Sequence, residues 1–153
     1  MLRLAAKAVV PAPVFAPVLA LALAGCSGEA DGNRVTAGDA RPFDGIAADE
    51  TFHFSGTEPF WGGQVVGETL TYTVPDDIEG QQITVKRFAG LNGLGFSGEL
   101  GGQNFDMAVT QGDCSDGMSD RTYPFTVTLR LGDGVRNGCG YTGTQPFTGT
   151  GSP

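Results

Sequence analysis

The chain has 153 residues, enough for one ordinary domain, with 25 glycines and a formal net charge of −8. So much glycine favours turns and closely packed strands, and a helical fold is not expected. The negative charge makes nucleic acid and anionic membrane surfaces poor partners. A basic partner protein is electrostatically favoured, although an acidic surface also serves solubility.

The first 25 residues have the pattern of a secretory signal peptide. Arg3 and Lys7 form a basic start, and an apolar run with three prolines extends over 9–24. Prolines at this density would disturb a permanent transmembrane helix, so we expect the segment to be removed after export. Its removal takes away two basic residues and no acidic ones, which leaves a net charge of about −10.

Leu23-Ala24-Gly25-Cys26 ends this stretch and matches a bacterial lipobox. Small residues suit the lipoprotein signal peptidase, and the Cys26 thiol accepts a diacylglycerol, so residues 1–25 are predicted to be removed. The alternative is an ordinary cleavage site with a chance cysteine. Acyl chains contribute roughly 0.8 kcal/mol per buried methylene, so the attachment would be lasting. Ser27 in place of Asp resembles the sorting pattern of Gram-negative outer-membrane lipoproteins, which predicts the inner leaflet facing the periplasm.

Lipidation of Cys26 would leave one pair, Cys114 and Cys139, in a compartment that permits disulfides. We predict that these two cysteines form a bridge. Closure of a loop of about 25 residues contributes roughly 3 kcal/mol in the chain-entropy model. The alternatives are two buried free thiols or a metal site, for which the sequence offers no supporting ligands. Neither a metal nor a cofactor is predicted.

Composition divides the mature chain into three parts. Residues 26–50 are rich in Gly, Ala, Asp and Glu and hold few large apolar residues, which predicts a flexible tether. The folded β domain is expected over 51–141. Residues 142–153 consist largely of Thr, Gly and Pro with a single Phe147, and are predicted to form a disordered tail.

Within the β domain, apolar residues recur with period two, as in Leu70, Tyr72 and Val74. This alternation is typical of half-buried strands, and no long stretch has helical spacing. The pattern predicts an all-β fold of about seven to nine strands, either a small antiparallel barrel or a sandwich. Barrel closure removes exposed edges, so the barrel is favoured.

Glycine turns allow the pairing of neighbouring strands to be predicted, because a two-residue turn fixes which residues face each other. A turn at Gly101-Gly102 sets Phe96 opposite Met107 and Leu94 opposite Val109. A turn at Gly67-Glu68 gives the pairs Val65 with Leu70, Gly63 with Tyr72 and Trp61 with Val74.

The last hairpin is predicted to have a three-residue loop, Gly132-Asp133-Gly134. This loop pairs Leu131 with Val135, Val127 with Cys139 and Phe125 with Tyr141. Cys139 then points into the core beside Val127, as expected for a buried bridge to Cys114.

The segment from Asp113 to Arg121 is dense in oxygen-bearing side chains around Gly117. Such density is typical of calcium loops, but Gly117 lies one place early for an EF-hand and no Glu closes the loop. The alternative, which we favour, is a short helical turn near 115–120 capped by Ser115 or Asp116. In that case Arg121 pairs with a nearby carboxylate.

Glu58-Pro59-Phe60-Trp61 combines a carboxylate with two aromatic rings, which suits recognition of a basic or amphipathic ligand. The strand pairing above sends Trp61 into the core and leaves Phe60 on the opposite face. Glu58 and Phe60 are therefore the candidate ligand contacts.

No catalytic residues are predicted. His53 is the only histidine, and a lone histidine supplies neither a metal site nor a catalytic relay, so we expect it to be solvated or hydrogen-bonded. The chain has no Gly-x-Ser-x-Gly elbow, no phosphate loop and no zinc-type Cys/His spacing.

The motifs Gly56-Thr57-Glu58-Pro59-Phe60-Trp61 and Cys114 to Arg121, ahead of Tyr123-Pro124 and Gly138-Cys139, resemble those of a family of bacterial envelope lipoproteins. The resemblance covers roughly Phe52 to Cys139 and implies an exported β domain. Such modules look like neighbours of HslJ-like META domains and of membrane-bound c-type lysozyme inhibitors, which implies a role in protecting the cell envelope.

Together these features predict a lipid-anchored periplasmic binding or envelope-integrity module without catalysis. Its expected partners are the membrane, through the lipid on Cys26, and a basic envelope protein. One alternative is an inhibitor of a cationic cell-wall hydrolase such as lysozyme. Another is a small hydrolase that uses a pair of carboxylates.

Overall fold

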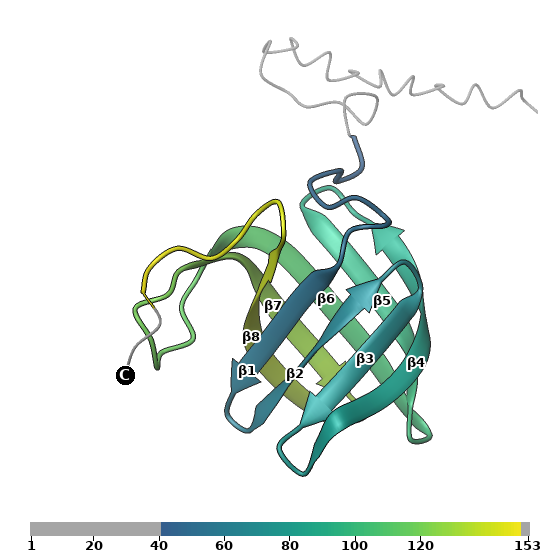
Figure 1. The fold of residues 1–153 in the computed structure, drawn as a ribbon. Coiled ribbons are helices and arrows are strands. Elements are labelled where there is room, and N and C mark those ends of the chain that lie inside the picture. The colour runs from purple at the N-terminus through teal and green to yellow at the C-terminus, as the bar shows by residue number, and fades with distance from the viewer. Residues whose placement is uncertain (1–40, 151–153) are drawn as a thin grey trace, which may run out of the picture. The chain divides into compact units, whose positions relative to one another are not determined.

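The computed structural model describes residues 41–150, which form a closed barrel of eight antiparallel strands (Figure 1). Successive strands are neighbours around the barrel, and β8 pairs back with β1. The strands are β1 (Phe52–Thr57), β2 (Phe60–Val66), β3 (Thr69–Val74), β4 (Asp77–Ala89), β5 (Gly93–Leu100), β6 (Gln103–Cys114), β7 (Tyr123–Leu131) and β8 (Gly134–Thr142). The predicted signal peptide and Cys26 lie outside the described residues.

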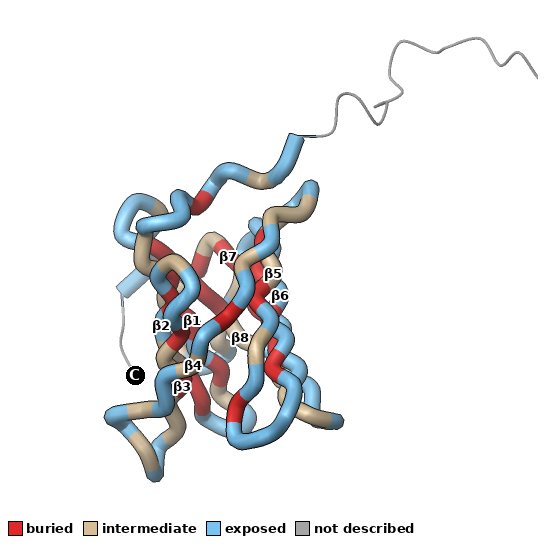
Figure 2. Tube along the Cα trace, turned by 90° about the vertical axis from the view of Figure 1, so that its right-hand side faces the viewer, coloured by how far each residue is buried: buried red, intermediate tan, exposed pale blue. Residues whose placement is uncertain are grey.

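The structure confirms an all-β fold and decides for the barrel over the sandwich. Buried positions alternate with more exposed ones along β1, β7 and the first part of β6 (Figure 2), because successive side chains of a strand point to opposite faces. The inward side chains meet in a single core that includes Phe52, Phe105, Phe125 and Trp61. Within residues 41–150, no helix has the length and apolar character needed to cross a membrane.

Two of the predicted hairpins pair as expected. Phe96 faces Met107 and Leu94 faces Val109 across the Gly101-Gly102 turn. Val65 faces Leu70 across the Gly67-Glu68 turn. Gly67, Gly101 and Gly102 all have positive φ, which only glycine adopts at little cost, so the turn residues fix these registers.

The predicted register of the last hairpin is wrong by one residue. Gly132 and Asp133 form a two-residue turn, with Leu131 opposite Gly134 and Arg130 opposite Val135. Val135 is consequently exposed, and Arg136 lies opposite the buried Leu129. Arg136 can lie on the inner face because its guanidinium donates a hydrogen bond to the Tyr72 hydroxyl.

The barrel has two distinct ends because its strands alternate in direction. We call the end where the chain enters β1 the proximal end; the β2–β3 and β4–β5 connections share it, whereas the β6–β7 connection lies at the side of the barrel and reaches the end of β1 (Figure 1). The opposite, distal end carries the β1–β2, β3–β4, β5–β6 and β7–β8 turns.

The folded domain begins before residue 51, so the predicted tether boundary is wrong. Ile46 is buried in the core cluster, and Phe43 packs against it. The Phe43 amide donates a hydrogen bond to the Gly90 carbonyl at 2.7 Å. These two isolated apolar residues have no periodic pattern, which explains why composition alone assigned them to a tether.

Residues 142–150 are also part of the fold, contrary to the predicted disordered tail. Thr142 is fully buried, and Thr122 and Thr148 form an antiparallel bridge. The Phe147 ring lies 5.3 Å from the Tyr123 ring and 5.2 Å from the Tyr141 ring, measured between centroids. The Phe147 ring, the Thr122–Thr148 bridge and hydrogen bonds from Thr144 to Glu50 thus attach the segment to the rest of the domain.

Candidate functional site

Cys114 and Cys139 form the predicted disulfide, with their Cα atoms 5.6 Å apart. The predicted register required Cys139 to point into the core beside Val127, and the structure contradicts this. It lies opposite Thr126, which is exposed, and opposite residues share a face of the sheet. The bridge therefore lies on the outer face of the barrel, where Cys139 is nevertheless buried.

Residues 115–122, which we call the overhang, connect β6 to β7. No helical turn forms there; the segment consists of bends with a positive φ at Gly117. The Asp116 carboxylate organises it by accepting hydrogen bonds from the Met118 amide at 2.9 Å and the Ser119 amide at 2.8 Å. These bonds favour the charged form, so the pKa of Asp116 lies below its usual value, with the Met118 amide contributing most.

Arg121 is predicted to pair with a carboxylate, but in the structure it lies over an aromatic ring. Its guanidinium carbon is 4.4 Å from the centre of the Phe147 ring. A cation over the face of an aromatic ring is attracted by the ring quadrupole. This contact joins the overhang to the C-terminal segment.

The calcium-loop alternative finds no support in the geometry of the overhang. Besides the two amides, the Ser119 hydroxyl at 2.8 Å and the Tyr123 hydroxyl at 3.3 Å donate to the Asp116 carboxylate. Its oxygens are thus engaged with protein donors. In the part of the chain that the structure describes, no three His, Cys, Asp or Glu side chains are arranged to hold a metal ion.

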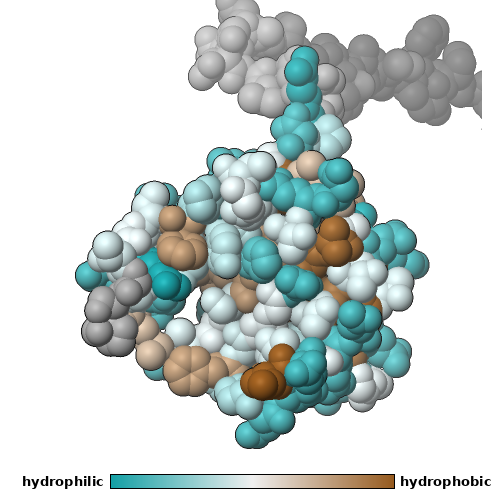
Figure 3. Space-filling view, in the orientation of Figure 1, coloured by the Kyte–Doolittle hydropathy of each residue, from teal (hydrophilic) through white to brown (hydrophobic). Residues whose placement is uncertain are grey.

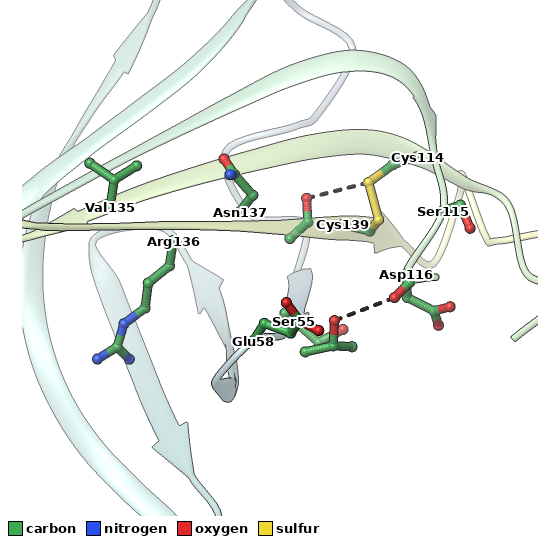
Figure 4. Close-up of a pocket in the computed structure, with 12 residues that line it drawn as sticks. Ser55, Glu58, Cys114, Ser115, Asp116, Val135, Arg136, Asn137 and Cys139 are labelled. Atoms are coloured by element: carbon green, nitrogen blue, oxygen red, sulfur yellow. Dashed lines mark hydrogen bonds between the residues drawn. A yellow bond between two sulfur atoms is a disulfide. The ribbon is translucent and has the colours of Figure 1, made fainter. Parts of the chain in front are cut away.

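A polar cleft of about 340 Å³ lies between the overhang and the outer face of β1 and β8 (Figure 4). The Thr57 hydroxyl donates a hydrogen bond to the Asp116 main-chain carbonyl at 3.4 Å, which connects the overhang to the end of β1. The space-filling view shows the surface hollowed on this side of the barrel (Figure 3). The cleft is lined by Ser55, Gly56, Thr57, Glu58, Cys114, Ser115, Asp116, Val135, Arg136, Asn137, Gly138 and Cys139.

The β1–β2 turn forms one rim of this cleft, and we call residues 58–60 the lip. Trp61 is 3% exposed and belongs to the core, whereas Phe60 is 53% exposed, as the period-two pattern predicted. Glu58 is exposed and lines the polar cleft. The structure therefore places both candidate contact residues at the surface, on the same turn.

A second, largely apolar hollow of about 370 Å³ lies on the other side of the lip. Phe60 lines it together with Ile78, which lies near the start of β4 and is 79% exposed. Figure 3 shows apolar surface at this distal edge of the barrel. Ser55 borders both hollows, so the lip separates a polar cleft from an apolar one.

The charge of the polar cleft is set by Glu58. Arg136 is the basic residue that lines the cleft, but its guanidinium donates to the Tyr72 hydroxyl and extends away from Glu58 and Ser55 (Figure 4). The Asp116 carboxylate faces its own loop. The exposed Glu58 carboxylate is thus the charge that the cleft offers to a ligand, and it favours a cation.

Sequence reasoning proposed Glu58 and Phe60 as contacts but did not indicate the other residues that line the two hollows. Asn137 and Ser115 line the cleft from β8 and the overhang, and Ile78 extends the apolar hollow. The density of Ser and Asp beside Cys114 was the available signal for the overhang. Nothing in the sequence indicated that this segment lies beside the β1–β2 turn.

His53 is half-buried at the barrel surface, and its ring stacks on that of Tyr141 with centroids 5.0 Å apart. It is therefore packed against an aromatic neighbour and lies outside the set of residues that line either hollow.

Comparison with protein-family models, with curated protein sequences and with solved structures found no match to this chain.

Proposed function

We propose that this protein is a lipid-anchored binding module of the outer membrane, displayed in the periplasm, that captures a basic partner protein without catalysis. The lipid on Cys26 supplies the attachment, and the lip with its two hollows supplies the contact surface. Residues 27–40 connect the anchor to the described domain.

The observation that carries this proposal is the placement of Glu58 and Phe60. Both are exposed on one turn, and they border a polar cleft and an apolar hollow respectively. A basic side chain entering the cleft would meet the Glu58 carboxylate, while an adjacent apolar side chain would pack against Phe60. Partial burial strengthens both contacts because water is excluded around them.

The hydrolase alternative gains no support from the two acidic residues that line the cleft. Glycoside hydrolysis requires one carboxyl group to remain protonated as a general acid. The pKa of Asp116 is lowered by the amides of its own loop, so that carboxyl group is ionised at neutral pH. It organises the overhang and is turned away from the cleft.

Inhibition of a cationic cell-wall hydrolase such as lysozyme is a second candidate function. Two features favour it: the net charge of −8 and a surface cleft whose free charge is a carboxylate. Complementary charge of this kind mainly accelerates association and selects the partner. Inhibition additionally requires that the bound protein cover the active site of the hydrolase.

The test measures binding of the full chain, held in detergent, to immobilised lysozyme and to a polylysine peptide. Glu58→Gln is expected to weaken binding by about tenfold, equivalent to about 1.4 kcal/mol. Phe60→Ser should weaken binding to lysozyme more than binding to polylysine, because polylysine has no apolar side chain for the hollow. Glu99→Gln, an exposed change in β5 at the same end of the barrel, is the matched control.

Equal affinities for wild type and Glu58→Gln, or no binding to either probe, would contradict the proposal. Lysozyme activity measured in the same samples separates the two candidate functions. Loss of activity in proportion to the bound fraction supports the inhibitor, and unchanged activity supports a binding module alone.

A further inference from the structure

The proximal end of the barrel carries exposed apolar side chains, as the lip does. Phe88 is 68% exposed near the end of β4, and Leu91 is 64% exposed in the β4–β5 connection. Val66, at the end of β2, is also exposed. We call these three residues the proximal patch. None of them lines the polar cleft or the hollow beside Phe60.

Residues 43–48, which precede β1, cross this same end. The Phe43 amide donates to the Gly90 carbonyl at 2.7 Å, next to Leu91, and the Gly67 amide donates to the Ala48 carbonyl at 3.0 Å, next to Val66. The chain between Cys26 and Arg41 spans at most about 50 Å when fully extended. A lipid on Cys26 therefore holds Arg41, at the proximal end, within about 50 Å of the bilayer surface.

Charge at the proximal end is mixed. Lys86 is exposed two residues before Phe88 and so shares its face of β4, and Arg41 is exposed where the described chain begins. Asp44 and Glu68 are exposed at the same end. Attachment here would therefore depend on the apolar side chains, with Lys86 and Arg41 near the phosphate groups of the lipids.

We propose that the proximal patch inserts into the interfacial zone of the bilayer that carries the Cys26 lipid, so that the barrel stands on the membrane with its lip directed away. This inference rests on the lipid attachment in the proposed function. Aromatic and aliphatic side chains such as Phe88 and Leu91 partition into the boundary between headgroups and acyl chains. The distal lip, with Glu58 and Phe60, is then presented to the periplasm.

The experiment places a tryptophan at each end of the lipidated full chain, reconstituted into phosphatidylethanolamine and phosphatidylcholine vesicles. Some of the lipids carry bromine near the upper end of the acyl chains, where it quenches tryptophan fluorescence. Leu91→Trp reports on the proximal patch, and Phe88→Trp is a second reporter at that end. Ile78→Trp, at a distal position that is also exposed, is the matched control. The buried Trp61 supplies the constant background measured in the parent chain.

Quenching of the Leu91→Trp and Phe88→Trp signals, with no quenching of Ile78→Trp, is the expected result. Equal quenching at both ends, or none at residues 88 and 91, overturns the inference. Flotation with the vesicles tests the lipid anchor separately from the orientation of the barrel. A chain that floats but shows no proximal quenching retains its anchor and loses only the orientation, whereas a chain that does not float contradicts both the lipid anchor and the inserted patch.

Discussion

Trp61 illustrates how single residues define the wall next to the candidate site. Its indole nitrogen is buried and has no hydrogen-bond partner among the described residues. The ring edge lies so close to Gly56 and Gly138 that a Cβ atom on Gly56 would be 2.1 Å from the indole nitrogen. Glycine at these positions therefore lets the large ring fill the core directly behind the polar cleft.

Gly56→Ala should lower the free energy of unfolding by about 1–3 kcal/mol, because the added methyl overlaps both the indole and the Asn137 carbonyl. Urea denaturation followed by Trp61 fluorescence measures the change. Gly143→Ala is the control, since its added Cβ meets no atom within 4 Å. Equal stability of the two variants would contradict the packing described for Trp61.

Asp116 is expected to make stability depend on pH. Its pKa is lowered in the folded protein from an ordinary value of 3.8, chiefly by the Met118 amide. The charged carboxylate therefore stabilises the fold above pH 3.8, and this contribution is lost as the pH falls through the lower folded pKa. Asp116→Asn should be less stable than wild type at neutral pH, and the difference should shrink below pH 3.8.

Denaturation with urea at a series of pH values tests this prediction. Asp133→Asn, an exposed change in the β7–β8 turn, is the control. A difference between wild type and Asp116→Asn that stayed constant down to the lowest pH would show that the carboxylate charge does not hold the overhang.

At the scale of elements, contacts with distant segments hold both ends of the overhang. The disulfide ties Cys114 of β6, the residue just before the overhang, to β8, and the Thr57 hydroxyl ties the overhang to β1. The Thr122–Thr148 bridge and the contact of Arg121 with Phe147 join it to the C-terminal segment. Without these attachments, the Cys114 side of the polar cleft would have no fixed position. The shape of the site thus depends on contacts between segments far apart in the sequence.

Replacing both Cys114 and Cys139 by serine should lower the free energy of unfolding by about 3 kcal/mol, because the open chain gains conformational entropy when unfolded. The variant should also bind a basic partner more weakly, since the overhang is released from β8. Reducing agent should reproduce both losses in wild type and leave the double variant unchanged. Identical denaturation of wild type with and without reductant would refute the stabilising role of the bridge.

Local patterns predicted the elements well and their distant contacts poorly. The register of Phe96 with Met107 followed from a glycine turn and from alternation, both of which act over a few residues. The register at Leu131 was missed because the prediction placed apolar residues opposite one another, whereas Arg136 finds a hydroxyl partner on β3. Alternation likewise separated Phe60 from Trp61, but no local rule indicates that the overhang approaches Thr57.

At the scale of the whole molecule, the two ends of the barrel have different surroundings. The described chain enters β1 at the proximal end, and the lip lies at the distal end. In the proposed arrangement, with a lipid on Cys26 and the proximal patch in the bilayer, the lip would face away from the membrane. Capture of a soluble partner then requires no rearrangement of the barrel.

Cys26→Ala should abolish incorporation of a palmitate analogue and move the protein from the membrane fraction to the soluble periplasmic fraction. The expected change is nearly complete, because lasting attachment depends on the acyl chains. Cell fractionation with metabolic labelling measures both effects. Cys114→Ala is the control and should leave labelling intact, and unchanged labelling of Cys26→Ala would disprove the lipid anchor.

The pairing of β1 with β8 also constrains the order of folding. Phe52 is hydrogen-bonded into the same ladder as Thr142, so the first and last strands complete the wall together. Because ribosomes make the N-terminus first, β1 must wait for almost the entire domain to be synthesised before its final neighbour exists. Until then it is the free edge of an open sheet, exposed to pairing with other chains. A chaperone that shields β1 during this interval would protect the nascent protein more than one that acts on any internal strand.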